Sequence, residues 1–129
     1  MGKQDKCITV FCTYDDFAAY SLDSDSELNE YLQMMQEDKR FSEEFFRENA
    51  LVMVWYSDFN VYTNEVDSIC SIETNEETAY VSMLREYRPE ATYYIDTDVY
   101  KCVVSAVIKK SDIQKIKDLK LIVMTQSKQ

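Results

Sequence analysis

The sequence predicts an α+β domain in which an N-terminal strand and helices pack on a mostly antiparallel sheet of about five strands. Helical periodicity and helix-capping residues are confined to residues 13–49, whereas short apolar runs divided by turn residues fill residues 50–125. Helices and strands that occupy separate parts of a chain are typical of this class, and strands joined by hairpins pair antiparallel. The chain has 129 residues, of which 46% are hydrophobic, so residues 1–129 suit a single domain with its own core.

The N-terminal part of the chain is expected to form a short strand and two helices. Residues 8–11 (ITVF) are β-branched and apolar, which favours a strand. Thr13 is a candidate N-cap, because two aspartates suited to the first turn of a helix follow it closely. Ser24 and Glu27 have the spacing of a capping box for the second helix, which we expect to end near Lys39. The apolar residues that predict its buried face are Leu28, Tyr31, Leu32 and Met35.

The stretch FSEEFFRENALVMVWYS (41–57) changes abruptly from polar to apolar. Ser42 is expected to cap a short helical turn, and Phe45 and Phe46 are expected to point into the core. Asn49 is a helix stop, because asparagine tolerates the left-handed conformation that often ends a helix. The run ALVMVWY that follows predicts a central strand that is apolar on both faces. A helix followed directly by a buried strand explains the boundary without a ligand.

Four further strands are expected after the central one. They cover residues 61–73, 78–88, 100–110 and 120–125. Residues 74–77 (TNEE) predict a hairpin turn, in which Asn75 supplies the positive φ that glycine would otherwise provide. Pro89 ends the strand after this turn. The two faces of that strand are Tyr80, Ser82 and Leu84 against Val81, Met83 and Arg85. Ser111 with Gln114 predicts a brief capped turn before the last strand.

The residue types that are missing exclude several chemistries. The chain has no histidine, which removes Ser-His-Asp and Cys-His catalysis and the zinc sites that use imidazole. Gly2 is the only glycine, so the sequence contains neither a P-loop nor a glycine-rich dinucleotide motif. It also contains no C-x-x-C pair that could hold zinc through cysteines alone. We therefore expect a protein that is not an enzyme and that uses neither a cofactor nor a metal ion.

The charge and the hydropathy limit the partners and the compartment. A formal net charge of −10 repels nucleic-acid phosphates and anionic membranes. The charge could instead attract a basic partner protein or cations, or could simply keep the protein soluble. No apolar run approaches the ~20 residues of a membrane-spanning helix, so we expect no membrane insertion by this segment. The N-terminus lacks a signal-sequence profile. The expected location is the cytoplasm if Met1 is the native start, and the cell envelope or the exterior if a signal sequence was trimmed.

The four cysteines are expected to be reduced, because their spacing shows no disulfide framework. Cys7 and Cys12 are five residues apart, so on one strand they point to opposite faces and cannot easily bridge. Cys70 and Cys102 lie inside apolar runs, where a free cysteine behaves as a small buried hydrophobe. Cys12 has no neighbouring base in the sequence and is expected to be buried or inert.

A segment rich in tyrosine is the candidate protein interface. Its residues are Tyr93, Tyr94, Asp96, Asp98 and Tyr100. Exposed aromatic residues anchor protein interfaces, although tyrosine is also a favoured strand residue. The two aspartates could share one strand face as a weak cation site, or mark an acidic loop. Residues 23–27 (DSDSE) resemble a calcium loop only superficially, because the glycine and the later glutamate of an EF-hand are missing; helix capping explains them better.

Two motifs carry a family resemblance. The first is Tyr14, Asp15, Asp16 and Phe17, and the second is Glu44, Phe45, Phe46, Asn49, Leu51, Val52 and Val54. EVDSI (65–69), then Arg85 and Pro89, and then VIKKSDI (107–113) follow in the corresponding order. Together they resemble a group of small bacterial domains, many of them in secreted lipoproteins of Gram-positive bacteria. They are also similar to the carboxyl-terminal domain of a lipoprotein associated with a secreted protease complex. The resemblance implies a binding or scaffold role and supplies no catalytic residues.

The expected function is that of a non-enzymatic domain that binds another protein through its acidic and tyrosine-rich surfaces. The alternative is an acidic inhibitor, such as an immunity protein or a nucleic-acid mimic that blocks a toxin or nuclease. The two differ in charge layout, because a mimic carries carboxylates along one ridge and its binding weakens steeply with salt. A third reading, a hydrolase that uses two carboxylates, would require a deep cleft lined by paired acids.

Overall fold

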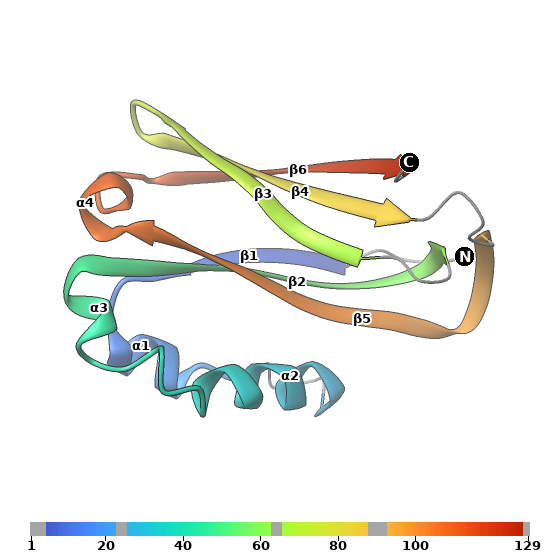
Figure 1. Cartoon of the computed structure of the whole chain (residues 1–129), viewed down its shortest axis with the longest axis horizontal. Coiled ribbons are helices and arrows are strands. Elements are labelled where there is room, and N and C mark those ends of the chain that lie inside the picture. Colours follow the sequence, from blue (N-terminus) through green and yellow to red (C-terminus); the bar gives the residue numbers. More distant parts are fainter. Residues whose placement is uncertain (1–4, 23–25, 63–65, 88–92, 128–129) are drawn as a thin grey trace.

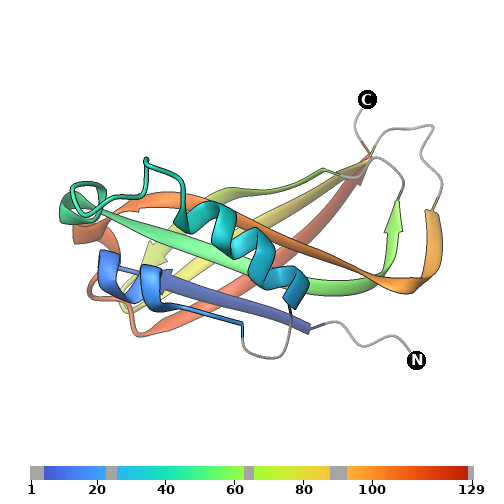
Figure 2. The same cartoon turned by 90° about the horizontal axis from the view of Figure 1, so that it is seen from below.

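The computed structural model describes residues 5–22, 26–62, 66–87 and 93–127, and for residues 5–6, 58–62 and 93–100 it describes the backbone alone. Within these residues, six strands form two three-stranded sheets that pack face to face, and a helical layer lies on the outer side of one sheet (Figures 1 and 2). The elements are β1 (Asp5–Phe11), α1 (Tyr14–Ala19), α2 (Ser26–Gln36), α3 (Phe45–Glu48), β2 (Asn49–Tyr62), β3 (Val66–Asn75), β4 (Thr78–Tyr87), β5 (Tyr93–Lys109), α4 (Lys110–Ile113) and β6 (Asp118–Ser127).

The strands form two sheets, whereas the sequence predicted one. The first sheet has the order β1-β2-β5 and is antiparallel throughout. The second has the order β3-β4-β6, in which β3 and β4 are antiparallel but β4 and β6 are parallel. After β4 the chain crosses to the first sheet as β5, turns through α4 and returns to the second sheet as β6. Helices and strands are therefore both present as predicted, but a single sheet of about five strands is wrong.

The helical layer and the first sheet enclose one part of the core. Its buried members are Phe11, Phe17, Leu22, Leu28, Leu32, Phe46, Leu51 and Met53. Phe45 packs against this cluster with its ring centroid 4.9 Å from that of Phe46, so the expectation that both phenylalanines fill the interior is confirmed. Leu28 and Leu32 are buried as the helical periodicity predicts, whereas Tyr31 is 43% exposed and was wrongly assigned to the buried face.

Hydrogen bonds at the helix ends fix the helices to one another. Thr13 caps α1 as predicted, since its hydroxyl accepts from the amide of Asp16 at 3.1 Å. Gln36, the last residue of α2, donates from its side-chain amide to the carbonyl oxygens of Phe17 at 2.8 Å and Tyr20 at 3.0 Å. One side chain thereby satisfies the open carboxyl end of α1. The predicted capping box rests on Ser24, which lies outside the described residues.

The boundary at residues 41–57 is a helical turn followed by the central strand, as predicted, but its ends differ from the prediction. Ser42 does not cap α3; the N-cap is Glu44, which makes no side-chain capping bond. Asn49 does end the helix, but in an extended conformation (φ −120°, ψ 155°) and not the left-handed one. Its side-chain amide donates to the carbonyl of Phe45 at 3.1 Å. This bond closes the helix, so the backbone can enter β2 directly.

The second part of the core lies between the two sheets. Its fully buried residues are Val52, Val54 and Tyr56 of β2 and Val81 and Met83 of β4. β2 is therefore covered on both faces, as its unbroken apolar run predicts. β4 alternates as predicted, with Val81, Met83 and Arg85 on its buried face.

Three smaller predictions are wrong. In the β3–β4 hairpin the residue with positive φ (55°) is Glu76 and not Asn75. Cys70 is exposed, because the pairing of β3 with β4 shifts register between Ile69 and Ser71 and turns the residue between them outward. The last helical turn is α4, whose N-cap is Lys109 and not Ser111. All four cysteines are free thiols, and Cys102 is half-buried.

Candidate functional site

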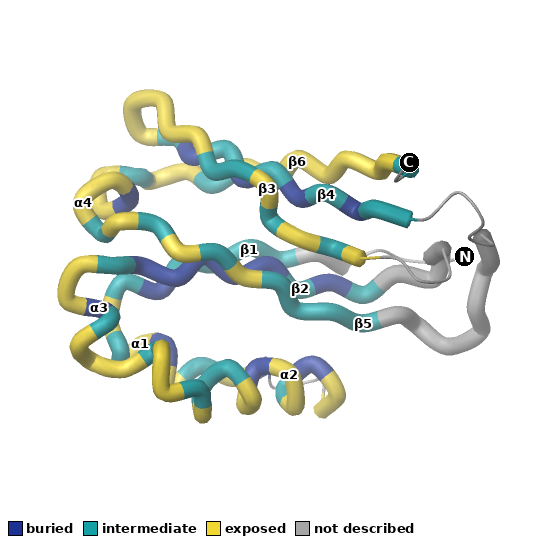
Figure 3. The backbone as a smooth tube through the Cα atoms, in the orientation of Figure 1, coloured by how far each residue is buried: buried dark blue, intermediate teal, exposed yellow. Residues whose placement is uncertain are grey.

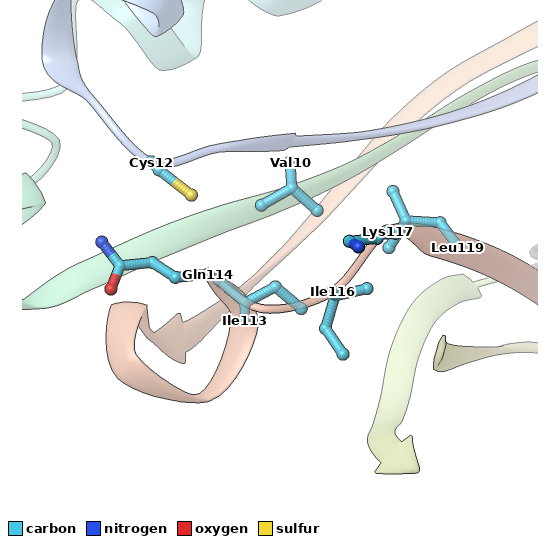
Figure 4. A pocket seen from close by; sticks show the side chains of 7 residues that line it. All are labelled: Val10, Cys12, Ile113, Gln114, Ile116, Lys117 and Leu119. Atoms are coloured by element: carbon cyan, nitrogen blue, oxygen red, sulfur yellow. The ribbon is translucent and has the colours of Figure 1, made fainter. Parts of the chain in front are cut away.

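A pocket of about 480 Å³ opens at the side of the sandwich where β1 of one sheet and β6 of the other lie close together, beside α4. Its lining residues are Val10, Cys12, Ile113, Gln114, Ile116, Lys117 and Leu119. Figure 4 shows Val10 and Cys12 on one wall and the residues of the α4–β6 segment on the other. Residues about one hundred positions apart in the sequence therefore form one concave surface.

Small residues in the two central strands explain why space remains here. Ala50 of β2 and Ala79 of β4 are fully buried and belong to the cluster beneath the pocket. Ile113, 4% exposed, inserts from α4 and fills part of the volume that larger side chains would occupy. Val10 and Leu119 pack at the edge of the same cluster, so the pocket has an aliphatic floor.

The outer wall of the pocket is held to the β3–β4 hairpin by Glu77. The backbone carbonyl of Glu77 accepts hydrogen bonds from the amides of Lys117 at 2.8 Å and Asp118 at 3.1 Å. The ammonium of Lys117 also lies 3.4 Å from the Glu77 carboxylate, with 76% of the lysine side chain exposed. The backbone of this wall is therefore fixed, whereas the lysine side chain at its surface remains largely in water.

The electrostatic environment of the pocket is unlike that of the whole chain. Residues 109–120 contain five lysines and two aspartates, a net charge of +3 in a protein whose net charge is −10. Burial raises the pKa of the Cys12 thiol above its usual value, nearby Lys110 opposes the rise, and Asp16 adds to it. Cys12 is therefore a neutral thiol near pH 7 and is poorly suited to nucleophilic catalysis. The pocket offers binding surface but no activated nucleophile.

A second polar group of residues lies between the sheets and is structural. The Asp67 carboxylate accepts a hydrogen bond from the Tyr56 hydroxyl and lies 3.6 Å from the Nε of Arg85. The Arg85 guanidinium also stands over the Tyr56 ring, 5.6 Å from its centroid. The side chains of Asp67 and Arg85 are 1% and 8% exposed, so the pair is closed to ligands. It joins β2 of the first sheet to β3 and β4 of the second.

The outer face of the second sheet is a further exposed surface. β6 is a terminal strand of that sheet, and Figure 3 shows much of it exposed. Ile122, Val123 and Met124 are 44%, 36% and 42% exposed. Ile122 and Met124 lie in register with Ser82 and Leu84 of β4, on the face that points away from the core. Val66 of β3, in register with Glu86, lies on the same outer face and is 64% exposed.

The tyrosine-rich candidate interface lies on β5. Tyr93 pairs with Tyr62, Tyr94 with Val61 and Tyr100 with Asp58 along β2. The side chains of Tyr93, Tyr94, Asp96, Asp98 and Tyr100 lie outside the described part of the structure, so the interface and the cation site both stay predictions.

Among the described residues, no three histidine, cysteine, aspartate or glutamate side chains gather as metal ligands would. No helix in the described ranges is long and apolar enough to cross a bilayer. Comparison with protein-family models, with curated proteins and with solved structures finds no match. The resemblance to lipoprotein domains therefore stays a prediction, and function has to be argued from the surfaces described above.

Sequence reasoning missed both the pocket and the apolar face. The run KLIVMT was recognised as a strand, but its position at the edge of a sheet depends on the parallel pairing with β4, which no local motif encodes. The lysines in residues 109–120 were the signal that could have marked the pocket.

Proposed function

We propose that this protein is a non-enzymatic binding domain that presents the β6 edge and the outer face of its second sheet to a partner protein. The observation that carries the proposal is β6 itself, a terminal strand of its sheet in which Ile122 and Met124 are apolar, exposed and turned away from the core. In soluble sheets with one free face, the outward positions are ordinarily polar. Exposed apolar residues at two neighbouring outward positions favour a role for this part of β6 as a contact surface.

The edge of β6 supports the same proposal. Residues 121–127 (LIVMTQS) contain no charged residue and no proline. Proteins usually protect a free strand edge with lysine, proline or a bulge, because an open edge accepts a strand from another chain. β3, at the other end of the sheet, has a bulge and the charged residue Glu73. Beyond Lys120, residues 121–127 of β6 thus suit a partner that adds an extended strand, with its side chains against Ile122 and Met124.

The test is a comparison of two double variants. Ile122→Lys/Met124→Lys charges the proposed surface, whereas Met34→Lys/Val107→Lys charges two residues that are 71% and 53% exposed on α2 and β5. Proteins retained from an extract of the source organism are identified with the immobilised wild-type protein, and the purified partner is then titrated against each variant. We expect the dissociation constant to rise at least tenfold for the first variant and less than twofold for the second. Equal affinity for both variants would refute the proposal.

A second candidate, an acidic inhibitor of a basic protein, is favoured by the charge of the helical segment. Residues 14–48 contain eleven acidic and three basic residues, a net charge of −8. The exposed acids described there are Asp15, Asp16, Glu27, Glu30, Glu37, Glu43, Glu44 and Glu48. A partner bound there would lose affinity as salt screens the attraction, whereas a partner bound to the apolar face would respond weakly to salt.

A further inference from the structure

The pocket between β1 and the α4–β6 segment has the size and lining of a ligand site. It includes Leu119 near the start of β6, whereas the surface proposed for the partner protein is centred further along that strand, at Ile122 and Met124. Its volume of about 480 Å³ falls within the roughly 300–1,000 Å³ of small-molecule sites. We propose that it binds a small amphiphile, an unbranched aliphatic carboxylate whose hydrocarbon chain enters between the sheets and whose carboxylate stays beside Lys117 at the mouth.

The lining selects an aliphatic body. Val10, Ile113, Ile116 and Leu119 supply branched aliphatic surface, and no aromatic ring is among the seven lining residues. A planar aromatic ligand gains most from stacking on rings, whereas a flexible alkyl chain gains from burial against aliphatic side chains. The floor continues into a buried cluster that contains Ala50 and Ala79, so the inner end of the pocket is apolar.

The mouth selects an anionic head group. Lys117 lines the pocket, and Lys110 is close enough to affect the charge state of Cys12. The acids that face this region are Glu77, which pairs with Lys117 at 3.4 Å, and Asp16, which acts on Cys12. The surrounding residues 109–120 keep a net charge of +3. Gln114 adds an amide that can donate a hydrogen bond to a carboxylate oxygen.

An aliphatic chain with an anionic head group could also belong to a membrane lipid. The charge of the protein favours a dissolved carboxylate over a lipid in a bilayer. A net charge of −10 repels an anionic bilayer, whereas a single dissolved carboxylate can approach the one lysine-rich segment. The proposed occupant is therefore a monomeric carboxylate and not a lipid surface.

The test uses the full chain with octanoate and decanoate, each below its micelle concentration, in isothermal titration calorimetry. Each methylene buried in an apolar site tightens binding about fourfold, so two more methylenes should lower the dissociation constant on the order of tenfold. We expect Lys117→Glu, which reverses the charge of the lysine that lines the pocket, to weaken decanoate binding at least fivefold. The matched variant Lys39→Glu, in the helical layer, should change it less than twofold. A dissociation constant that does not depend on chain length, or an equal effect of both variants, would overturn the proposal.

The cysteines report where the ligand binds. Cys12 lines the pocket, whereas Cys70 is exposed on β3, so alkylation of each thiol by iodoacetamide can be followed by peptide mass mapping. Saturating decanoate should slow the alkylation of Cys12 at least fivefold and leave that of Cys70 unchanged. Equal protection of both thiols would mean detergent-like coating and would overturn the site. Co-flotation of the protein with phosphatidylglycerol vesicles, without binding of monomeric decanoate, would overturn the choice of occupant.

Discussion

At the scale of single residues, Asp67 links the two sheets through its contacts with Tyr56 and Arg85. Its carboxylate lies within the sandwich, close to a guanidinium on the neighbouring strand and bonded to a phenol on the opposite sheet. Burying a charge is unfavourable unless a partner of opposite charge and hydrogen bonds compensate for the lost water. Asp67, Arg85 and Tyr56 are therefore expected to depend on one another.

Asp67→Asn should destabilise the protein by about 3–5 kcal/mol, because it keeps the shape of the side chain but removes the negative charge that faces the buried Arg85 guanidinium. Tyr56→Phe, which removes only the phenol donor, should cost about 1.5–3 kcal/mol. The measurement is the free energy of unfolding from urea titrations followed by far-UV circular dichroism.

The control is the double variant Asp67→Leu/Arg85→Met, which replaces both charges by apolar groups. It should be more stable than Asp67→Asn, since it removes both charges of the pair from the interior. A loss below about 1 kcal/mol for Asp67→Asn would contradict this account of the pair.

At the scale of helices and strands, elements with a strong local pattern were predictable and their pairing partners were not. The buried face of α2 follows from the spacing of Leu28 and Leu32, and β2 follows from its unbroken apolar run. The parallel pairing of β4 with β6 and the register shift at Cys70 depend on strands distant in sequence. The pocket was missed for the same reason, because Val10 and Leu119 meet only after both sheets have formed.

The β3–β4 hairpin tests how local turn chemistry acts within this fold. Its two-residue loop is Glu76-Glu77, and Glu76 has a positive φ of 55°. A residue with a Cβ in this region costs roughly 1 kcal/mol, and glycine is favoured at the first position of such loops. Glu76→Gly should therefore raise the free energy of unfolding by about 0.5–1 kcal/mol.

Asn75→Gly is the matched control for the hairpin, because Asn75 is the last residue of β3 and has no positive φ. It should lower the free energy of unfolding by about 0.5–1 kcal/mol, since glycine in an extended strand loses more chain entropy on folding. Thermal unfolding of both variants checks the two signs. If Asn75→Gly raised the free energy of unfolding and Glu76→Gly did not, the residue with positive φ would be Asn75, as the sequence predicts, and not Glu76.

At the scale of the whole molecule, charge is segregated. The segment with α1–α3 has a net charge of −8, whereas residues 109–120, which include α4 and the start of β6, have +3. The helical layer and the second sheet lie on opposite sides of the first sheet (Figure 1). The acidic helical layer and the β6 face are thus separate surfaces. A partner protein bound to the β6 face and a basic protein bound to the helical layer would therefore not compete.

The concentration of acids in the helical layer also predicts how salt changes stability. Two like charges about 10 Å apart repel by about 0.4 kcal/mol in water. The exposed acids of residues 14–48 include adjacent residues in the sequence, Asp15 with Asp16 and Glu43 with Glu44. Sodium chloride screens these repulsions, so raising it from about 10 mM to about 150 mM should increase the free energy of unfolding in urea by about 1 kcal/mol. Glu43→Gln/Glu44→Gln should reduce this gain, because it removes two acids from the layer. Lys39→Gln, which removes a cation from the same layer, should enlarge it. A fall in stability with added salt would mean that surface ion pairs such as Arg40–Asp38 outweigh the repulsion.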